Sequence, residues 1–467
     1  MTDPMRWMVR GALLAGALAI GPVAGAQTEG EQSAGSAAPT GSMEWLEVRR
    51  ERLANGLRVV LAPDRSLPTV GIAVYYDVGS RNEIRGASGF AHLFEHMMFQ
   101  GSANVAKGEH FSLIMNRGGS MNGTTSPDRT NYYETLPANE LALGLWLEAD
   151  RMKSLAVTEE NFENQRAVVI QEYQQSYGNR PYALSWLRID ELAYGDYWPY
   201  AHSTIGDLQD LESAPLSAVQ QFWMDYYAPN NAVLTVAGDF DPDEALAMVQ
   251  RYFGSIPARS VPPYEPPELL PQTSERADTI LDPLAERPAF HLAWHIPPFR
   301  DEGHYALELL GLILGDGESS RLYQELVKER ELLTEVSVFT DDRRGPDLFR
   351  VWGIVAEGAS AEDARERIYR QVANVGRNGV TRRELEKARN RLRSVFVFGL
   401  QSNLQRAQIL SEFEMYFGDA TLLGTELDRY LAVTADDIQE AARRYLTETN
   451  QTVLDVVPQP AEDEGEG

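Results

Sequence analysis

Three polar side chains interrupt an otherwise apolar segment at residues 89–99: His92, Glu95 and His96. Residues three and four apart share one face of a helix, so a helix here would project both imidazoles and the carboxylate together. Two neutral imidazoles can bind a borderline metal such as zinc, and a nearby carboxylate that is not a ligand can act as a base toward water. The spacing therefore predicts a metal site on a buried helix, provided that a third ligand lies elsewhere.

Glu172 is the candidate for that third ligand. It follows the apolar residues Val168, Val169 and Ile170 and precedes Tyr173. A carboxylate in so apolar a stretch is costly to bury unless it is paired or binds a metal. A solvent-facing helical glutamate and a buried ion pair are the alternatives.

The elements that must position these residues can be read from turn and cap signals. Thr158 is a plausible N-cap for the helix that carries Glu172, with Glu159 and Glu160 in its first turn. Asn55-Gly56 is a hairpin signal between two alternating runs. The strands expected in the first part of the chain are 47–53, 57–61, 70–78, 118–125, 129–135 and 232–237.

Two parts of the chain resemble each other, which indicates an internal duplication. Residues 157–166 align without a gap with 380–389, and 219–236 parallels 438–456. In the helix alignment Val395 falls opposite Glu172, so only the first copy would keep a metal site. The sequence predicts an α+β fold of two duplicated modules, each an antiparallel-rich sheet packed with helices. The expected modules are 43–256 and 288–457, joined by a proline-rich linker at 257–287.

Composition excludes several classes of protein. The 467 residues are 43% hydrophobic, which is typical of a globular protein with a substantial core. There is no cysteine, so disulfides, thiolate metal sites and cysteine nucleophiles are excluded. The formal net charge of -27 argues against nucleic acid as a partner. It is compatible with basic ligands, or with an acidic surface that only aids solubility.

Both ends of the chain differ from the rest. Residues 1–26 have a basic start, a short apolar run and an Ala-Gly-Ala cleavage site, which predicts a secretory signal peptide. We expect export, to the periplasm, without stable membrane insertion. Residues 27–42 are a low-complexity lead-in expected to be disordered, and 458–467 an acidic tail.

His92, Glu95 and His96 follow the H-x-x-E-H order of an inverted zinc peptidase. Together with Glu172, this motif resembles that of the pitrilysin, insulysin and mitochondrial processing peptidase family. Residues 118–124, 129–133 and 226–231 are similar to the family's edge strand and module ending, and the likeness covers 44–457. The resemblance implies one half of a bilobal peptidase, as in short bacterial members. It also implies one zinc ion per chain, held by His92, His96 and Glu172, with Glu95 as the general base.

The family resemblance also implies where a peptide would bind. The strand around 120–124 would take the substrate backbone as an added β-strand, with contacts from Ser120, Asn122 and Thr124. For Asn122, a turn-forming Asn-Gly pair is the competing interpretation.

The chain departs from the family pattern at three positions. Gln165 stands where a supporting glutamate is common, although an amide can still hydrogen bond to a ligand. Val327 and Thr334 replace an arginine and a tyrosine that grip the substrate. By similarity, we expect the catalytic subunit of a heterodimer whose homologous partner carries that Arg/Tyr pair.

Two alternatives to this heterodimer stay open. One is a homodimer. The other is a non-catalytic assembly or peptide-binding subunit with a structural metal. Glu95 discriminates between enzyme and structural site, because a structural site needs no base and usually has four protein ligands.

The remaining histidines are weaker candidates. His291 and His295 are four apart, but the segment alternates as a strand, which would put them roughly 13 Å apart. His110, His202 and His304 are interpreted as isolated surface residues.

Overall fold

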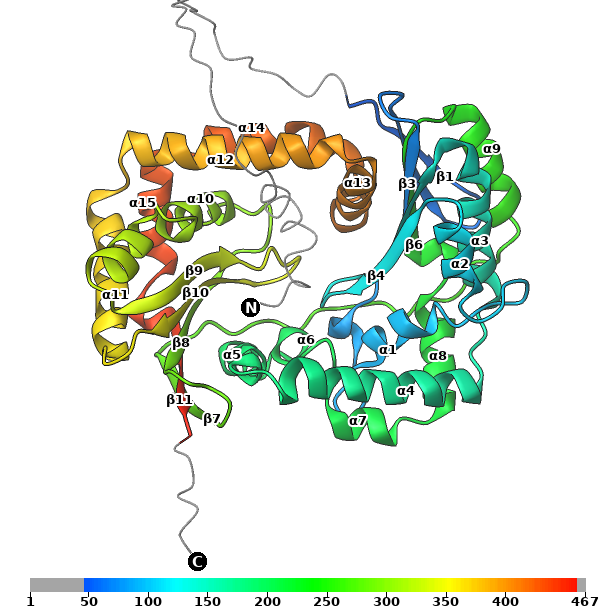
Figure 1. The fold of residues 1–467 in the computed structure, drawn as a ribbon. Coiled ribbons are helices and arrows are strands. Elements are labelled where there is room, and N and C mark those ends of the chain that lie inside the picture. The colour runs from blue at the N-terminus through cyan, green and yellow to red at the C-terminus, as the bar shows by residue number, and fades with distance from the viewer. Residues whose placement is uncertain (1–45, 460–467) are drawn as a thin grey trace, which may run out of the picture.

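The computed structural model describes residues 46–459 and contains two β-sheets in opposite halves of the molecule (Figure 1). The first sheet has the strand order β1-β2-β6-β3-β5-β4. Its strands are β1 (Arg49–Arg52), β2 (Arg58–Pro63), β3 (Thr69–Tyr76), β4 (Ser120–Thr125), β5 (Thr130–Pro137) and β6 (Ala232–Gly238).

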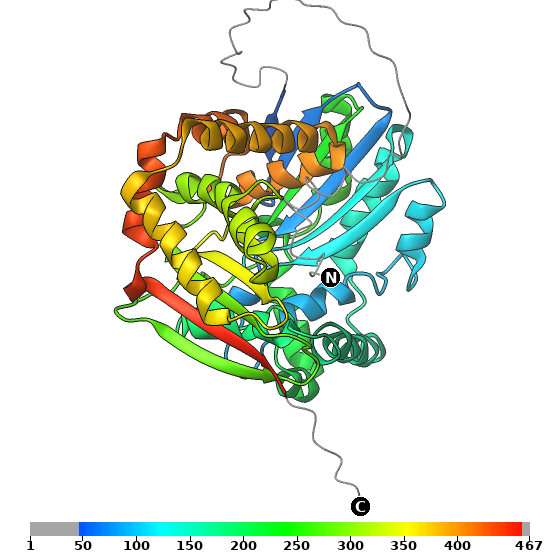
Figure 2. The same ribbon diagram turned by 60° about the vertical axis from the view of Figure 1, so that its left-hand side comes forward.

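The second sheet has the order β7-β11-β8-β10-β9. Its strands are β7 (Arg276–Asp282), β8 (Ala289–Ile296), β9 (Leu333–Thr340), β10 (Asp347–Val355) and β11 (Gln451–Pro458). β7 and β11 run side by side at one edge (Figure 2). β7 thus lies inside the range 257–287 that the sequence assigned to a linker.

The two sheets repeat one topology, with β1 as an addition to the first. In each, the first strand of the repeat pairs in parallel with the last one (β2 with β6, β7 with β11), and the other pairings are antiparallel. The predicted α+β class, with duplicated sheets packed against helices, is confirmed. The predicted hairpin at Asn55-Gly56 joins β1 to β2, and Gly56 takes a φ of 89° there.

Each sheet is covered on one face by helices of its own half. The first core joins that face to helices that include α1 (Phe90–Met97), α3 (Leu141–Ser154), α8 (Leu216–Tyr226) and α9 (Pro242–Phe253). The second core does the same with α10 (His304–Gly315), α11 (Ala361–Asn378), α12 (Arg382–Gln401), α14 (Glu426–Ala432) and α15 (Ala435–Tyr445).

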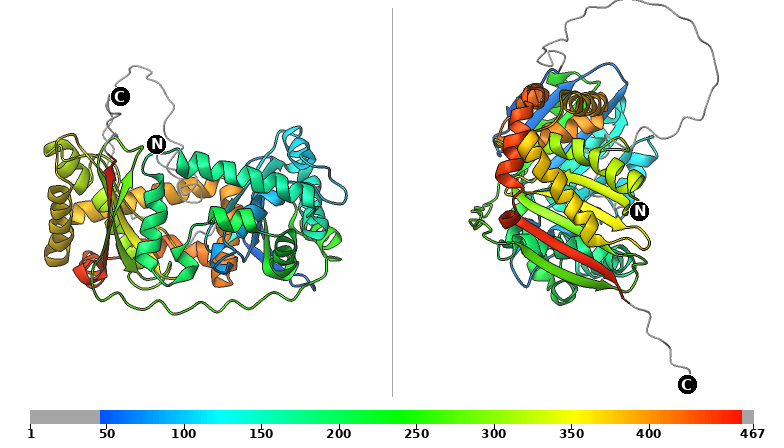
Figure 3. Two further views of the ribbon diagram at one scale, coloured as in Figure 1. Left: turned by 90° about the horizontal axis from the view of Figure 1, so that it is seen from below. Right: turned by 90° about the vertical axis from the view of Figure 1, so that its left-hand side faces the viewer.

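The opposite face of each sheet is covered by a helix from the other half of the chain. α13 (Asn403–Phe417) packs on β3 and β6, where a Cβ at Gly71 would come within 2.6 Å of Leu404 Cα. In return, α5 (Ala183–Tyr194) packs on β7, β8 and β11. The extended segment 257–275 runs along one side of the molecule from one half to the other (Figure 3). The two halves are therefore tied together by exchanged helices as well as by the connecting segment.

Four further α-helices lie within the described residues. They are α2 (Glu109–Met115), α4 (Glu159–Tyr173), α6 (Trp198–Ala201) and α7 (Leu208–Ser213), of which α4 continues into a π-helical turn at Gln174–Gly178. Within 46–459, no helix combines the length and the apolar character needed to cross a membrane. The predicted signal peptide and lead-in, and the tail from residue 460, lie outside the described residues.

Candidate metal centre and active site

Helices α1 and α4 pack together and bring His92, His96 and Glu172 to one point. Nε2 of His92 lies 3.8 Å from Oε1 of Glu172, and Nε2 of His96 lies 3.2 Å from Oε2 of the same carboxylate. One ligand atom from each of the three residues lies within 4.8 Å of the other two. Two imidazole nitrogens and one carboxylate oxygen are a donor set that zinc takes in catalytic sites, where one position stays open. These residues therefore fit the metal that the sequence indicated.

Glycines let α1 approach its neighbours. Gly89 begins the helix with a φ of 86°, and a Cβ there would lie 2.6 Å from the carbonyl oxygen of Ile205. On β4, a Cβ at Gly123 would lie 3.1 Å from Cγ of Glu95. A side chain at either position would push α1 away from the sheet or from the 205–206 turn.

Glu172 lies on the buried face of helix α4. Asn161, Gln165 and Val169 are buried on that face. The side chain of Glu172 is 27% exposed and Val168 is 39% exposed, so the stretch is less buried than the sequence argument assumed. Helical periodicity, rather than the apolar neighbours, aims Glu172 at α1.

The two histidines differ in charge preference. Burial lowers the pKa of His92 to about 4, with a further lowering from His96. Burial also opposes protonation of His96, but the hydrogen bond and charge of Glu172 outweigh it and raise the pKa of His96. Burial would raise the pKa of Glu172, yet its contact with both imidazoles lowers it. Burial thus favours the neutral ring of His92, whereas Glu172 favours the protonated ring of His96.

Glu95 lies on the same helix, but its carboxylate is held by β4. Thr125 donates its hydroxyl to Oε2 of Glu95 at 2.7 Å. Burial raises the pKa of Glu95, against the effect of that hydrogen bond. A more basic carboxylate beside a metal site is suited to take a proton from water.

Gln165 lies near His96. It is buried, contributes to the raised pKa of His96, and donates from Nε2 to Oδ1 of Asn164 at 2.8 Å. In contrast, Nδ1 of His92 is buried without a hydrogen-bond partner among residues 46–459. The orientation of the His92 ring therefore depends on packing.

β4 is the edge strand of the first sheet and presents two different faces. Gly123 and Thr125 face α1. Side chains alternate along a strand, so Ser120, Asn122 and Thr124 lie on the other face. The hydroxyl of Thr124 is buried and taken up by Asn131 and Arg129, while Ser120 and Asn122 are exposed. Sequence reasoning named only the second set. It missed Thr125, although the same period-two alternation could have pointed to it.

The interpretation of three histidines as surface residues is wrong. His110 and His304 are buried, with Nε2 of each at 3.4 Å from Glu134 and 3.1 Å from Asp342. His202 is half-buried, and its Nε2 lies 3.1 Å from Glu83. Their partners are far away in the sequence, which is why the surrounding residues did not reveal their burial.

The remaining pair was interpreted correctly as part of a strand. His291 and His295 lie on β8, where Nε2 of His291 contacts Ser185 at 2.7 Å and Nε2 of His295 contacts the Ala193 carbonyl at 2.8 Å. Both histidines contact α5, and neither belongs to a group of metal-ligating side chains among the described residues.

The second half has a counterpart of the α1–α4 pair without its ligands. α10 begins after Gly303, whose φ of 91° matches that of Gly89. Counted from these glycines, Ala306 and Leu310 take the places of the two histidines, while Val395 on α12 takes that of Glu172.

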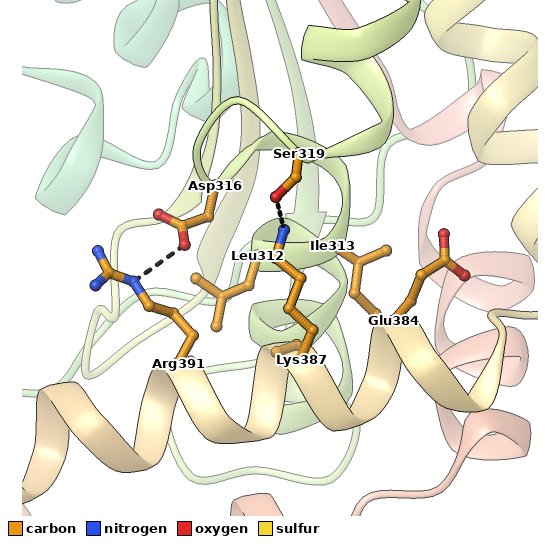
Figure 4. Close-up of a pocket in the computed structure, with 8 residues that line it drawn as sticks. Leu312, Ile313, Asp316, Ser319, Glu384, Lys387 and Arg391 are labelled. Atoms are coloured by element: carbon orange, nitrogen blue, oxygen red, sulfur yellow. Dashed lines mark hydrogen bonds and ion pairs between the residues drawn. The ribbon is translucent and has the colours of Figure 1, made fainter. Parts of the chain in front are cut away.

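A small pocket lies between α10 and α12, but none of these three substituted positions lines it. Its charged groups all have partners. Arg391 donates to Asp316 at 3.1 Å and Lys387 to Ser319 at 2.6 Å (Figure 4), while Glu384 pairs with Arg321 outside the pocket at 2.6 Å. The pocket brings together no group of three metal-ligating side chains among the described residues.

The two substituted substrate-grip positions also lie in this half. Val327 is half-buried against the second core in the π-helical segment Tyr323–Glu329. Thr334 is exposed on β9, with its hydroxyl 3.4 Å from the carbonyl of Ile354. Neither side chain offers a charge to a ligand.

Comparison with known proteins agrees with a first half that carries the candidate ligands and a second half that lacks them. Residues 58–185 match the family model described as Insulinase (Peptidase family M16), and residues 213–392 match that of the Peptidase M16 inactive domain. The chain is 27% identical over 412 residues to the zinc protease PqqE of Helicobacter pylori, covering 87% of this chain and 92% of that protein.

Solved structures share the fold. A protease from Helicobacter pylori superimposes with a TM-score of 0.83 at 26% identity, over 89% of this chain and all (100%) of that one. The periplasmic protease PqqL from Escherichia coli has a TM-score of 0.71 at 18% identity, over 88% of this chain and 47% of its own. With both family models matched in order and relatives of the same length and fold, the chain belongs to the insulinase family of peptidases, family M16.

Proposed function

We propose that this chain is a zinc-dependent endopeptidase subunit that cleaves peptides or unfolded segments. The observation that carries the proposal is the convergence of His92, His96 and Glu172 within 4.8 Å, next to the buried carboxylate of Glu95. The three ligands would hold one zinc ion per chain. When bound, zinc polarises the scissile carbonyl and makes water more acidic.

The residues of α1 and β4 supply the proton chemistry. Glu95 takes a proton from the attacking water and passes it to the leaving amine. The Thr125 hydroxyl holds Oε2 and leaves Oε1 of Glu95 free for this exchange. Gln165 keeps the ring of His96 in its ligating orientation.

The substrate would extend the first sheet. β4 is an edge strand, so its outer backbone groups are available to pair with an extended peptide beside α1. Ser120 and Asn122 are exposed and remain proposed side-chain contacts. The buried, hydrogen-bonded hydroxyl of Thr124 instead supports the strand from within.

A partner chain would complete the grip on the substrate. Val327 and Thr334 offer no charged or aromatic group, which favours a heterodimer with a homologous chain that carries the missing Arg/Tyr pair. A homodimer is the second arrangement. The short relatives named zinc proteases are of similar length, and this chain spans 47% of PqqL, as one half of a two-half assembly would.

Export to the periplasm is proposed from residues 1–26, and the module boundaries 43–256 and 288–457 from the duplicated pattern. PqqL, which shares this fold, is a periplasmic protease of Escherichia coli.

Cleavage assays with matched variants test the function. The chain is purified alone and after co-expression with a homologous chain that carries the Arg/Tyr pair, and assayed on unfolded peptides. We expect zinc-dependent cleavage by the wild type, and retained zinc without cleavage in Glu95→Gln. Wild-type protein that holds zinc and cleaves nothing in any combination would establish the alternative, a non-catalytic subunit with a structural metal. Full activity of the single chain would refute the need for a different partner.

A further inference from the structure

The start of α1 is held by a buried carboxylate that the proposed chemistry does not use. Oε2 of Glu83 accepts the backbone N–H of Gly89 at 2.9 Å, and Oε1 accepts that of Ala91 at 2.8 Å. The first N–H groups of a helix have no partner within the helix, so these bonds satisfy them. His92 follows Ala91 directly, and the carboxylate therefore fixes the backbone one residue before the first metal ligand.

The charge of Glu83 is compensated by a histidine from a distant loop. The Glu83 side chain has 0% exposure, and Nε2 of His202 lies 3.1 Å from its Oε2. Nδ1 of His202 lies 2.7 Å from the carbonyl oxygen of Trp198, which can only accept, so Nδ1 carries a proton. A hydrogen bond between Nε2 and Oε2, which lie 3.1 Å apart, then requires one further proton on either atom. The pair is therefore neutral as a whole, which allows the carboxyl group to be buried.

Trp198 fixes the histidine in place. Its indole stacks on the His202 ring with centroids 3.9 Å apart and planes 5° apart, and its Nε1 donates to the Glu83 carbonyl at 2.8 Å. The guanidinium of Arg85 covers the indole at 4.6 Å. Residues 198–202 therefore contact both the side chain and the backbone of Glu83, which in turn holds the start of α1.

We propose that Glu83 is a positioning residue for the metal-binding helix, acting through the N–H groups of Gly89 and Ala91 with His202 as its compensating partner. The inference rests on the proposed zinc site. A glutamine at position 83 keeps one acceptor but turns an N–H₂ group toward the other backbone donor. The first turn of α1 would then shift, and His92 has no hydrogen bond at Nδ1 to correct its aim.

The test compares Glu83→Gln and His202→Gln with a matched cap removal. Oδ1 of Asp241 caps α9 by accepting the N–H groups of Asp243 and Glu244 at 3.0 and 3.1 Å, so Asp241→Ala loses a similar pair of contacts on another helix. The readouts are the zinc dissociation constant of the full chain, measured with Zn²⁺ alone against a chromogenic chelator, thermal unfolding of the metal-free protein, and kcat and KM.

We expect Glu83→Gln to weaken zinc binding about tenfold, the low end for residues that orient ligands, and to lower kcat with KM within twofold. Asp241→Ala should lower the unfolding temperature and leave zinc affinity unchanged. If Glu83→Gln does not fold, His202→Gln carries the test: weaker zinc binding supports the inference and unchanged binding overturns it. Equal zinc affinity in Glu83→Gln and wild type also overturns it. A shift in zinc affinity without cleavage by any variant or by wild type would instead keep the positioning role and refute the peptidase.

Discussion

Thr125 on β4 donates its hydroxyl to Oε2 of Glu95 on α1, at 2.7 Å. This bond joins the edge strand, where a peptide would add, to the group that would act as the base. The same strand would therefore set the position of the substrate backbone and that of the proposed base.

Replacing Thr125 by valine keeps the shape and removes the donor. A hydrogen bond to a charged group contributes about 1.5–3 kcal/mol, so kcat should fall about tenfold or more. The bond lowers the pKa of Glu95 against burial, so its loss raises that pKa further. Because the base must be ionised, the acidic limb of the kcat/KM profile should move to higher pH. Thr135→Val, half-buried on β5, is the control, and an unchanged acidic limb in Thr125→Val would contradict the role.

Gly123 should be intolerant of even one methyl group. The added Cβ would lie 3.1 Å from Cγ of Glu95 and 3.2 Å from Cδ1 of Tyr132, so Gly123→Ala displaces the base or the ring. We expect kcat to fall about tenfold, since small displacements of catalytic groups are costly. Gly424→Ala, which meets nothing within 4 Å, should behave as wild type. If both variants keep full kcat, the close contact of β4 with Glu95 has no catalytic consequence.

Glu172 and Glu163 lie on the same helix and give a matched pair for metal binding. Glu172→Gln replaces a proposed anionic ligand and should weaken zinc binding about a hundredfold. Glu163, 52% exposed and paired with Arg166, faces away from α1, so Glu163→Gln should bind zinc normally. The measurement is chelator competition with Zn²⁺. Comparable affinities in the two variants would remove Glu172 from the ligand set.

How far the sequence predicts this molecule depends on how local each feature is. The spacing of His92 and His96, the Thr158 cap and the Asn55-Gly56 turn act within a few residues, and each forms as expected. The meeting of Glu172 with α1 needed both helical periodicity and the family resemblance. The apolar neighbours of Glu172 suggested that its stretch is buried, but Val168 is exposed.

Features that depend on tertiary contacts could not be predicted. Nothing in the residues next to Glu83 indicates that it is buried, because its partner His202 is brought to it only by the fold. The exchange of α5 and α13 between the halves likewise leaves no local pattern. Burial of a single histidine is decided by partners more than twenty residues away, as His110 and His304 show.

His304 should make stability fall as pH rises. Burial disfavours its protonation, but the hydrogen bond to Asp342 and the charges of Asp342, Asp347 and Glu308 raise the pKa of His304 to about 9. A group whose folded pKa exceeds its unfolded value stabilises fully below the unfolded value, near 6.5, and this contribution is lost as pH rises through about 9. Burial raises the pKa of Asp347 to about 8, which adds a decline of the same sign at lower pH.

Urea unfolding at pH 6, 7.5 and 9 measures this decline, with His304→Gln as the test variant. The variant should be less stable than wild type by about 3 kcal/mol at pH 6, the cost of breaking a buried ion pair, and the difference should narrow by pH 9. His291→Gln is the control, because burial lowers the pKa of His291 well below 6.5. Its contribution to stability therefore increases as pH rises through about 6.5 and stays level from pH 7.5 to 9, where that of His304 declines. A difference between wild type and His304→Gln that stays constant from pH 6 to 9 would mean that His304 is neutral in the folded chain, and that Asp342 is held by other donors.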